Sequence, residues 1–310
     1  MPWPNRLEGG TYLFDGIRGH AGLDEPERSN AIHGLVRWLP WELKERSQDR
    51  ISLRCHLHPQ PAYPFQLELT VTYKVHSSGL VVSTTATNLD AKDLPFGAGF
   101  HPYLAPPPSL GYAHPQHVEP EPSMQQTPCK EHLCPAQMRA SGKEGRSGYQ
   151  GASAPIDTCL LQLPAEIALE SDERGLPKGR RSVAGTGLDF RSPRLVKETK
   201  LDTAFTSLTR DNQGRAWAVL ESPEPALRTR DETGEDNGPP RAVAVWVDES
   251  FPYLMCYTGD TLPNPHRRRT GIAIEPMTCP PNAFRTGEDL IRLGPGESWS
   301  GNWGIEQRRP

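Results

Sequence analysis

The sequence predicts an all-β protein, an antiparallel β-sandwich that residues 1–310 form as a single domain. Apolar and polar residues alternate along several short runs, turn-forming residues separate these runs, and no helical pattern exceeds two turns. The 33 Pro and 28 Gly residues also favour strands and turns over helices. Packing two antiparallel sheets face to face buries the apolar side of every such strand.

The clearest strand pair is predicted in residues 65–88. In the run FQLELTVTYKV one face carries Phe65, Leu67, Leu69, Val71, Tyr73 and Val75. A turn at residues 76–79 then leads into LVVSTTATN, which is rich in β-branched residues, so the pair reads as a hairpin. Further strands are predicted at 51–57, 216–222, 242–248, 252–258, 271–275 and 299–305.

Two polar stretches interrupt this pattern. Residues 106–156 are rich in Pro, Ser, Gly, Gln and charged residues and contain little to bury, which predicts a long flexible insertion on the sandwich. Residues 229–240 predict a shorter polar loop between two strands.

Composition excludes several classes of function. The 34 basic and 38 acidic residues give a net charge of −4, which argues against nucleic acid and anionic membranes as partners. No run reaches the length of a membrane-spanning helix, and the first residues lack the apolar core of a signal peptide. The six cysteines have no paired spacing, which indicates reduced thiols and a cytoplasmic protein.

Two segments place an ionisable residue beside glycine or proline on an extended run. In PFGAGFHPY (95–103), His101 shares a face with two glycines, where a ligand has room against the backbone; the alternative is a loop histidine held by a carbonyl. In GIAIEPMTCPPNAF (271–284), Glu275 lies opposite Ile272 and Ile274, and Pro276 is expected to end the ladder. The alternative there is an ordinary solvent-facing glutamate.

Two further segments are less specific. NAIHGLVRWLPW (30–41) contains Asn30, His33 and Arg37, and LDTAFTSL (201–208) contains Asp202, which can bind a hydroxyl or cap a turn. Paired acid and base groups suit proton transfer, and aromatic faces suit the C–H surfaces of sugars. The tryptophans considered for such a groove are Trp3, Trp38, Trp41 and Trp246.

Together these motifs resemble the aldose 1-epimerase (galactose mutarotase) family. PWPNRLEGGTYLFDG (2–16) resembles the segment around its substrate-binding arginine, here Arg6, and residues 30–41 and 97–104 resemble its two histidine motifs. Residues 201–208 resemble its aspartate motif, and residues 273–284 with 287–298 resemble its carboxylate motif and closing strands. The middle region, at 163–179 and 185–191, is also similar, so the resemblance covers most of the chain in the same order.

The resemblance implies a fold and a mechanism. The fold would be the galactose mutarotase-like supersandwich, with Glu275 as general base and His101 as general acid in opening the sugar ring. Arg6, His33 and Asp202 would bind the substrate, a free aldohexose of the galactose or glucose class. Proton transfer of this kind needs no metal and no organic cofactor.

The sequence also departs from the family pattern. Family members usually have several strands before the segment at residues 2–16, so the resemblance predicts that the first strands are missing. The insertion is longer than in the family and contains His114, His117, Cys129, His132 and Cys134. Their spacing fits no zinc motif, and we predict no metal site.

Three other functions are weighed. A hexose-6-phosphate 1-epimerase would need a basic cluster near the sugar phosphate, for which residues 266–269 (HRRR) are the candidate. A non-catalytic sugar-binding sandwich would not need a matched acid and base. A lyase or hydrolase would use a pair of carboxylates in place of a His/Glu pair.

Overall fold

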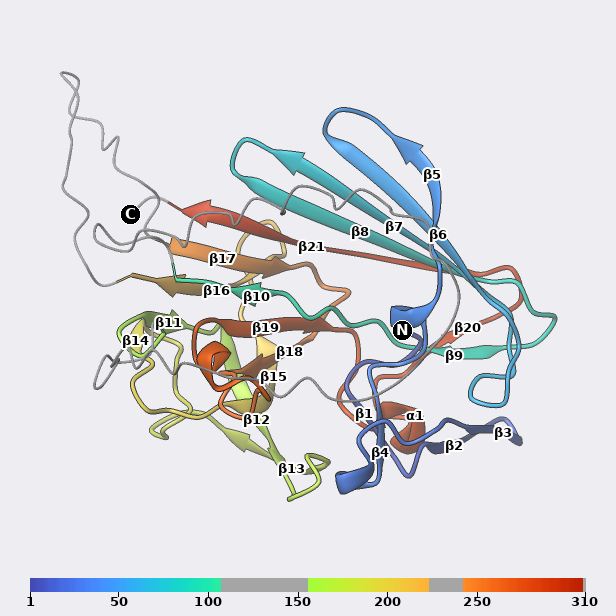
Figure 1. The fold of residues 1–310 in the computed structure, drawn as a ribbon, viewed down its shortest axis with the longest axis horizontal. Helices are drawn as coiled ribbons and strands as arrows, with labels where there is room; N and C mark the ends of the chain where they lie inside the picture. Colours follow the sequence, from blue (N-terminus) through green and yellow to red (C-terminus); the bar gives the residue numbers. More distant parts are fainter. Residues whose placement is uncertain (107–155, 223–241, 309–310) are drawn as a thin grey trace, which may run out of the picture.

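A computed structural model describes residues 1–106, 156–222 and 242–308, and Figure 1 shows two large sheets stacked as the layers of a sandwich. The larger sheet has nine strands, in the order β14 (Arg194–Leu195), β11 (Leu160–Gln162), β16 (Ala216–Glu221), β17 (Ala242–Val247), β21 (Ser298–Arg308), β8 (Gly79–Asn88), β7 (Leu67–His76), β6 (Arg50–Leu57) and β5 (Glu42–Arg46). The smaller has six, in the order β10 (Tyr103–Leu104), β19 (Ile272–Met277), β18 (Tyr253–Tyr257), β15 (Asp202–Leu208), β12 (Ala165–Ser171) and β13 (Pro177–Ser182).

The remaining described elements are short. Three antiparallel pairs join β1 (Arg6–Glu8) to β4 (Asn30–Ile32), β2 (Thr11–Phe14) to β3 (Ile17–His20), and β9 (Leu94–Phe96) to β20 (Ile291–Leu293). The helical segments in the described ranges are α1 (Ala283–Thr286) and the 3₁₀ turns η1 (Pro26–Arg28), η2 (Val36–Trp38) and η3 (Pro265–Arg267). None of them is long and apolar enough to cross a membrane.

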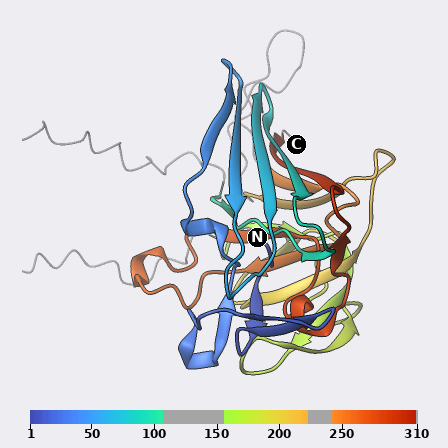
Figure 2. The same ribbon diagram turned by 90° about the vertical axis from the view of Figure 1, so that its right-hand side faces the viewer.

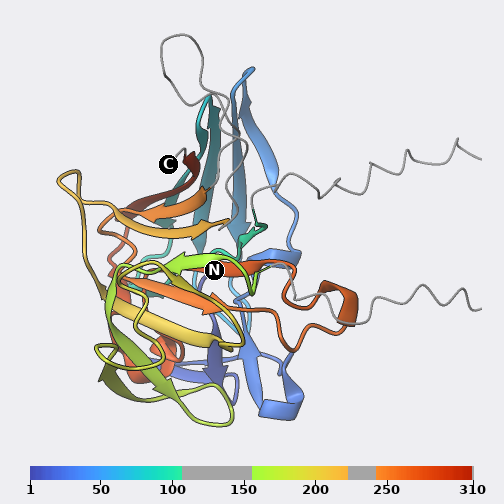
Figure 3. The same ribbon diagram turned by 90° about the vertical axis from the view of Figure 1, so that its left-hand side faces the viewer.

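The antiparallel sandwich predicted from alternation is confirmed. Every strand predicted by residue range is present, and β7 and β8 form the expected hairpin, with His76 paired to Gly79 at its turn. Figures 2 and 3 show β5 to β8 rising steeply and projecting beyond the six-stranded sheet. The predicted insertion at 106–156 lies almost entirely outside the described residues, and the loop at 229–240 lies wholly outside them.

The core fills the space between the two sheets. Leu67, Leu69 and Val71 of β7 are buried from one side, and Ile272 and Ile274 of β19 from the other. Each apolar side chain of this size contributes about 1.5–3 kcal/mol when it is fully buried. The apolar side chains that produce this alternation therefore also make the main contribution to the stability of the folded protein.

The opposite face of the six-stranded sheet carries polar residues, and the strand register brings them together. Met255 of β18 pairs with Glu275 of β19, and Tyr257 pairs with Asp202 of β15. Because residues two apart on a strand share a face, Glu275 and Asp202 project from the same side of the sheet. That side faces away from the main core.

The prediction that Pro276 ends its ladder is wrong. Strand β19 continues to Met277, and Pro276 pairs with Leu254 of β18. On the other edge of β19, the segment before β10 runs alongside: the Phe100 amide donates to the Pro276 carbonyl, and Gly99 pairs with Met277. The missing N–H therefore removes one hydrogen bond without ending the ladder.

Candidate active site

Glu275 is a buried carboxylate in the centre of β19. Glu275 alternates with Ile272 and Ile274 along β19, as predicted. It is only 4% exposed, so it is not the solvent-facing glutamate of the alternative interpretation. Burial raises the pKa of Glu275 well above the ordinary value, the nearby Asp202 charge raises it further, and Arg6 offsets part of the rise. A carboxylate with this affinity for protons is suited to accept one from a substrate.

Backbone hydrogen bonds hold His101 beside this carboxylate. The Phe100 amide donates to the Pro276 carbonyl at 3.1 Å, and the Ile274 amide donates to the Pro102 carbonyl at 3.2 Å. The residues flanking His101 are thus fixed to the residues flanking Glu275. As a result His101 Nε2 lies 3.0 Å from Glu275 Oε1.

The two groups have converging proton affinities. Burial lowers the pKa of His101, whereas burial raises that of Glu275. These opposite shifts reduce the preference that a free imidazole has for the proton over a free carboxylate. An acid and a base that exchange roles within one reaction require this property.

His33 approaches the pair from the N-terminal segment. Its ring lies edge-on to His101, with centroids 5.4 Å apart, and its backbone is left-handed, with φ 63°. The His33 amide donates to the Asn5 carbonyl at 2.8 Å, which fixes this turn. Burial, followed by the charges of His101 and Arg37, lowers the pKa of His33 to about 3, so the ring is neutral at physiological pH.

We expect His33 to make the folded protein sensitive to acid. Between its ordinary pKa of 6.5 and its folded value of about 3, the unfolded chain binds a proton here that the folded protein does not. The free energy of unfolding is therefore unaffected by His33 above pH 6.5 and decreases as the pH falls through this window, by up to ~1.4 kcal/mol per pH unit. Urea unfolding from pH 4 to 8 should show that slope reduced in His33→Asn; equal slopes would contradict it.

Arg6 and Asp202 complete the set of predicted residues. Arg6 Nη2 lies 3.5 Å from Asp202 Oδ2, and Arg28 Nη1 lies 3.7 Å from the same oxygen. Asp202 begins β15, and its side chain is 41% exposed. A partly exposed carboxylate between two guanidinium groups is available to accept a hydrogen bond from a hydroxyl.

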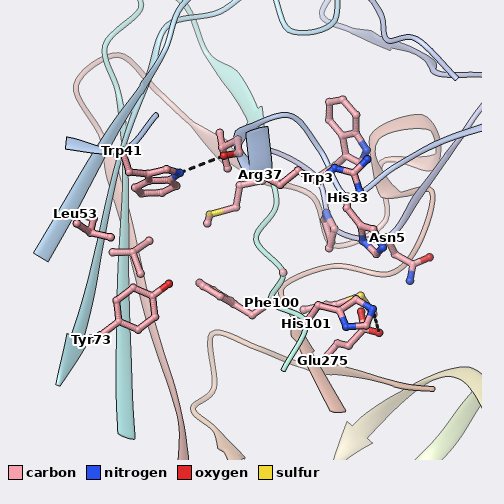
Figure 4. A pocket seen from close by; sticks show the side chains of 16 residues that line it. Trp3, Asn5, His33, Arg37, Trp41, Leu53, Tyr73, Phe100, His101 and Glu275 are labelled. Atoms are coloured by element: carbon pink, nitrogen blue, oxygen red, sulfur yellow. Dashed lines mark hydrogen bonds and ion pairs between the residues drawn. The ribbon is translucent and has the colours of Figure 1, made fainter. Parts of the chain in front are cut away.

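The five predicted residues meet at one polar cavity of about 350 Å³, lined by Asn5, Arg6, Glu25, Glu27, Arg28, Ile32, His33, His101, Asp202, Met255, Tyr257, Thr261 and Glu275. A second cavity, of about 540 Å³, is mainly apolar and shares Asn5, His33, His101 and Glu275 with the first. Figure 4 shows it between Trp41, Leu53 and Tyr73 on one side and the His101–Glu275 pair on the other. The acid/base pair therefore lies on the boundary between a polar and an apolar cavity.

Two expectations about the groove are corrected. The open surface expected at the glycines of 95–103 is filled at Gly97, where Pro4 and Cys279 pack, whereas Gly99 contacts Pro4 and also lines the apolar cavity. Of the tryptophans considered, Trp3 and Trp41 line the apolar cavity, whereas Trp246 is buried in β17 and Trp38 is 79% exposed. None of the four lines the polar cavity.

Sequence reasoning missed six polar residues of the cavity: Asn5, Glu25, Glu27, Arg28, Tyr257 and Thr261. Asn5 was within reach, because it precedes Arg6 in the segment that indicated the site. Tyr257 follows from the strand register with Asp202. Glu25 and Arg28 lie in a short loop without any pattern of their own.

The described residues contain no group of three or more His, Cys, Asp or Glu side chains placed to bind a metal ion. The histidines and cysteines of residues 114–134 lie outside the described ranges. Cys55, Cys256 and Cys279 are buried free thiols, and Cys159 is also buried.

Comparison with known proteins identifies the family. The model of the aldose 1-epimerase family matches residues 1–121 and 149–306. The chain belongs to the aldose 1-epimerase family. The protein YihR of Escherichia coli K12 is 27% identical over 299 residues, covering 96% of this chain and 74% of YihR.

Solved structures of similar proteins share the fold of this aldose 1-epimerase family member. A GalM/aldose epimerase homologue from C. elegans has a TM-score of 0.69 at 17% identity, over 100% of this chain and 81% of its own. A putative aldose 1-epimerase from Escherichia coli K12 has a TM-score of 0.67 at 19% identity, over 100% of this chain and 82% of its own. A galactose 1-epimerase from Lactobacillus acidophilus has a TM-score of 0.65 at 18% identity, over 99% of this chain and 78% of its own. These likenesses confirm the galactose mutarotase-like sandwich.

Proposed function

We propose that this protein is a mutarotase that interconverts the α and β anomers of a neutral aldohexose. One observation carries the proposal: His101 Nε2 and Glu275 Oε1 lie 3.0 Å apart at a polar cavity that Arg6, His33 and Asp202 also line. Opening a cyclic hemiacetal requires one proton to leave and another to arrive at two oxygens on the same carbon. A contacting acid/base pair meets that requirement.

The reaction follows from these positions. Glu275 removes the proton of the C1 hydroxyl while His101 protonates the ring oxygen, and the bond between C1 and the ring oxygen breaks. The open-chain aldehyde rotates about its C1–C2 bond. On closure the C5 hydroxyl attacks the other face of C1, His101 takes the proton of that hydroxyl, and Glu275 returns a proton to the former aldehyde oxygen. The enzyme ends in its starting protonation state.

The other cavity residues would orient the sugar. Neutral His33 can donate or accept a hydrogen bond, Arg6 can only donate and Asp202 accepts. Such mixed groups match the hydroxyls of a sugar, each of which both donates and accepts. Correct orientation adds to the ~10²–10⁴-fold that each proton-transfer group typically contributes.

The charges of the cavity support a neutral sugar over a hexose 6-phosphate. Four carboxyl groups, those of Glu25, Glu27, Asp202 and Glu275, line it with only two guanidinium groups, so an added phosphate would be repelled. None of residues 266–269 lines this cavity. Arg269 in this basic segment is already engaged, because it lies 2.6 Å from Asp157 and 3.0 Å from Asp260.

Polarimetry tests the proposal directly. The optical rotation of freshly dissolved α-galactose and α-glucose is followed with and without protein, and glucose 6-phosphate serves as the comparison substrate. Faster equilibration of the free sugars is expected. Acceleration of the phosphate ester alone would establish the 6-phosphate epimerase, and sugar binding without acceleration would establish a binding module.

The rate should follow a bell-shaped pH profile set by the pair as a unit. Activity requires one shared proton, so it is lost when a second proton binds or when the last one leaves. The acid limb is expected where the general base becomes protonated and the alkaline limb where the general acid loses its proton, with the maximum between them. A rate that climbs steadily from pH 4 to 10, as hydroxide catalysis does, would contradict this assignment.

A further inference from the structure

Glu25 makes the strongest contacts of the Arg6 side chain. Arg6 Nε donates to Glu25 Oε2 at 2.9 Å, and Arg6 Nη2 donates to Glu25 Oε1 at 3.1 Å, a two-point pairing of guanidinium and carboxylate. Both side chains are largely buried. Asn30 Nδ2 donates to Glu25 Oε2 at 3.0 Å, which fixes the carboxylate from its other side.

A hairpin tip from the six-stranded sheet holds the loop that carries Glu25. Arg174, between β12 and β13, donates from Nε to the Arg28 carbonyl at 2.9 Å and from Nη2 to the Ser29 carbonyl at 3.0 Å. Its own carbonyl accepts from Asn30 Nδ2 at 2.9 Å. Backbone groups of the loop are thus tied to an element far away in the sequence.

The same hairpin tip closes over Arg6. Gly175 has φ +74°, and a Cβ atom added there would lie 2.5 Å from Arg6 Nη1 and 2.7 Å from Arg6 Cζ. A Cβ atom does not come this close to a neighbouring side chain, so only glycine lets the backbone cover the guanidinium group. Arg6 is therefore enclosed between a carboxylate and a backbone turn.

We propose that Glu25, Asn30, Arg174 and Gly175 form a clasp whose role is to position Arg6 toward the sugar and to balance its charge. The inference rests on the proposed function and assigns positioning residues to the same site. With Nε and one Nη2 hydrogen committed to Glu25 and Nη1 covered by Gly175, Arg6 Nη2 is held 3.5 Å from Asp202 Oδ2 at the cavity. An arginine free to rotate would lose this direction.

The clasp also tunes the acid/base pair through charge. Arg6 lowers the pKa of Glu275, and the Glu25 carboxylate partly neutralises Arg6. Removing the charge of Glu25 should therefore lower the pKa of Glu275. Moving Arg6 away should raise it. The two changes predict opposite shifts of the pH–rate profile, which general damage to the fold does not produce.

A pair of glycine variants isolates the contact with Arg6. Gly185 also has a left-handed backbone, with φ +69°, but an added Cβ would meet nothing within 4 Å. Gly175→Ala and Gly185→Ala should therefore lower the melting temperature similarly. Only Gly175→Ala should raise KM, by about tenfold, the size of a lost hydrogen bond to a charged group, and move the profile to higher pH. Equal kinetics in the two variants would overturn the clasp.

Glu25 variants test the carboxylate itself. Glu25→Gln keeps the shape and should raise KM about tenfold while moving the pH profile to lower pH. Glu25→Asp keeps the charge, so it should leave the profile in place and restore part of the affinity. Wild-type kinetics for Glu25→Gln in an active protein would refute the inference and leave the proposed function standing.

A measurement without catalysis separates the two proposals. The Arg6 Nε–H signal in a ¹H–¹⁵N NMR spectrum, assigned by its loss in Arg6→Lys, should exchange slowly with water in the wild type and quickly in Glu25→Gln. If the wild type accelerates no anomerisation, the proposed function fails. The clasp is then decided by whether galactose shifts this signal in the wild type and leaves it unshifted in Glu25→Gln.

Discussion

Glu275→Gln is expected to slow anomer interconversion by ~10²–10⁴-fold, because an amide cannot accept the proton of the C1 hydroxyl at neutral pH. The loss should appear in kcat, while KM changes little, since glutamine keeps the size and the hydrogen-bonding oxygen of the side chain. Polarimetry at saturating sugar measures it. The residual rate should lose its acid limb, because no general base remains to be protonated at low pH.

The matched control is Glu170→Gln on the same sheet. Glu170 lies on β12, and its partly exposed carboxylate lies 3.6 Å from Arg181, remote from the cavity residues. This variant should keep full activity. Equal rates for Glu275→Gln and the wild type would remove the general base from the mechanism.

Glu275→Gln should also stabilise the folded protein at alkaline pH. A folded pKa above the unfolded value means that the folded protein keeps a proton which the unfolded chain has lost. Wild-type stability therefore falls as the pH rises from 4.5 through the folded pKa, by up to ~1.4 kcal/mol per pH unit. Glutamine has no such dependence, so its advantage in urea unfolding should grow with pH. A catalytic carboxylate that destabilises its own fold is the expected compromise at an active site.

Local patterning predicted the fold because each strand buries one face. Leu67, Leu69 and Val71 alternate with polar residues, and all three enter the core. The proline rule failed at Pro276 for a reason that no local pattern contains. A missing amide removes one hydrogen bond, and the ladder continues because bonds to residues far away in the sequence remain: Pro276 pairs with Leu254, and its carbonyl accepts from the Phe100 amide.

The site followed from motifs, whereas its surroundings did not. Each predicted residue lies in a recognisable segment, and the structure brings Arg6, His33, His101, Asp202 and Glu275 to one cavity. Their approach depends on long-range contacts, such as the docking of residues 100–102 along β19.

Glu25 shows why part of the site could not be found in this way. Its partner Arg6 is 19 residues away, and the arginine that anchors its loop is Arg174. The expectation of an open surface failed at Gly97 for a related reason. A glycine signals that something approaches the backbone, but the sequence does not say whether it is a ligand or, as here, another part of the chain.

His101→Asn is expected to reduce the rate by ~10²–10⁴-fold through the other half of the proton exchange. Asparagine keeps a hydrogen-bond donor near the position of the ring, but it cannot deliver a proton to the ring oxygen as the bond to C1 breaks. With the imidazole gone, only Glu275 titrates. Because Glu275 must be deprotonated to act as the base, the residual rate should rise with pH to a plateau, without the alkaline limb that the pair shows.

Two comparisons distinguish a lost acid from a disturbed site. His56→Asn, on β6 and away from both cavities that His101 lines, should behave as the wild type. The double variant Glu275→Gln with His101→Asn should be little slower than either single variant, because acid and base act in one concerted exchange and losing either disables it. Losses that multiply in the double variant would mean that the two groups act in separate steps, and the 3.0 Å contact would then reflect packing instead of shared proton transfer.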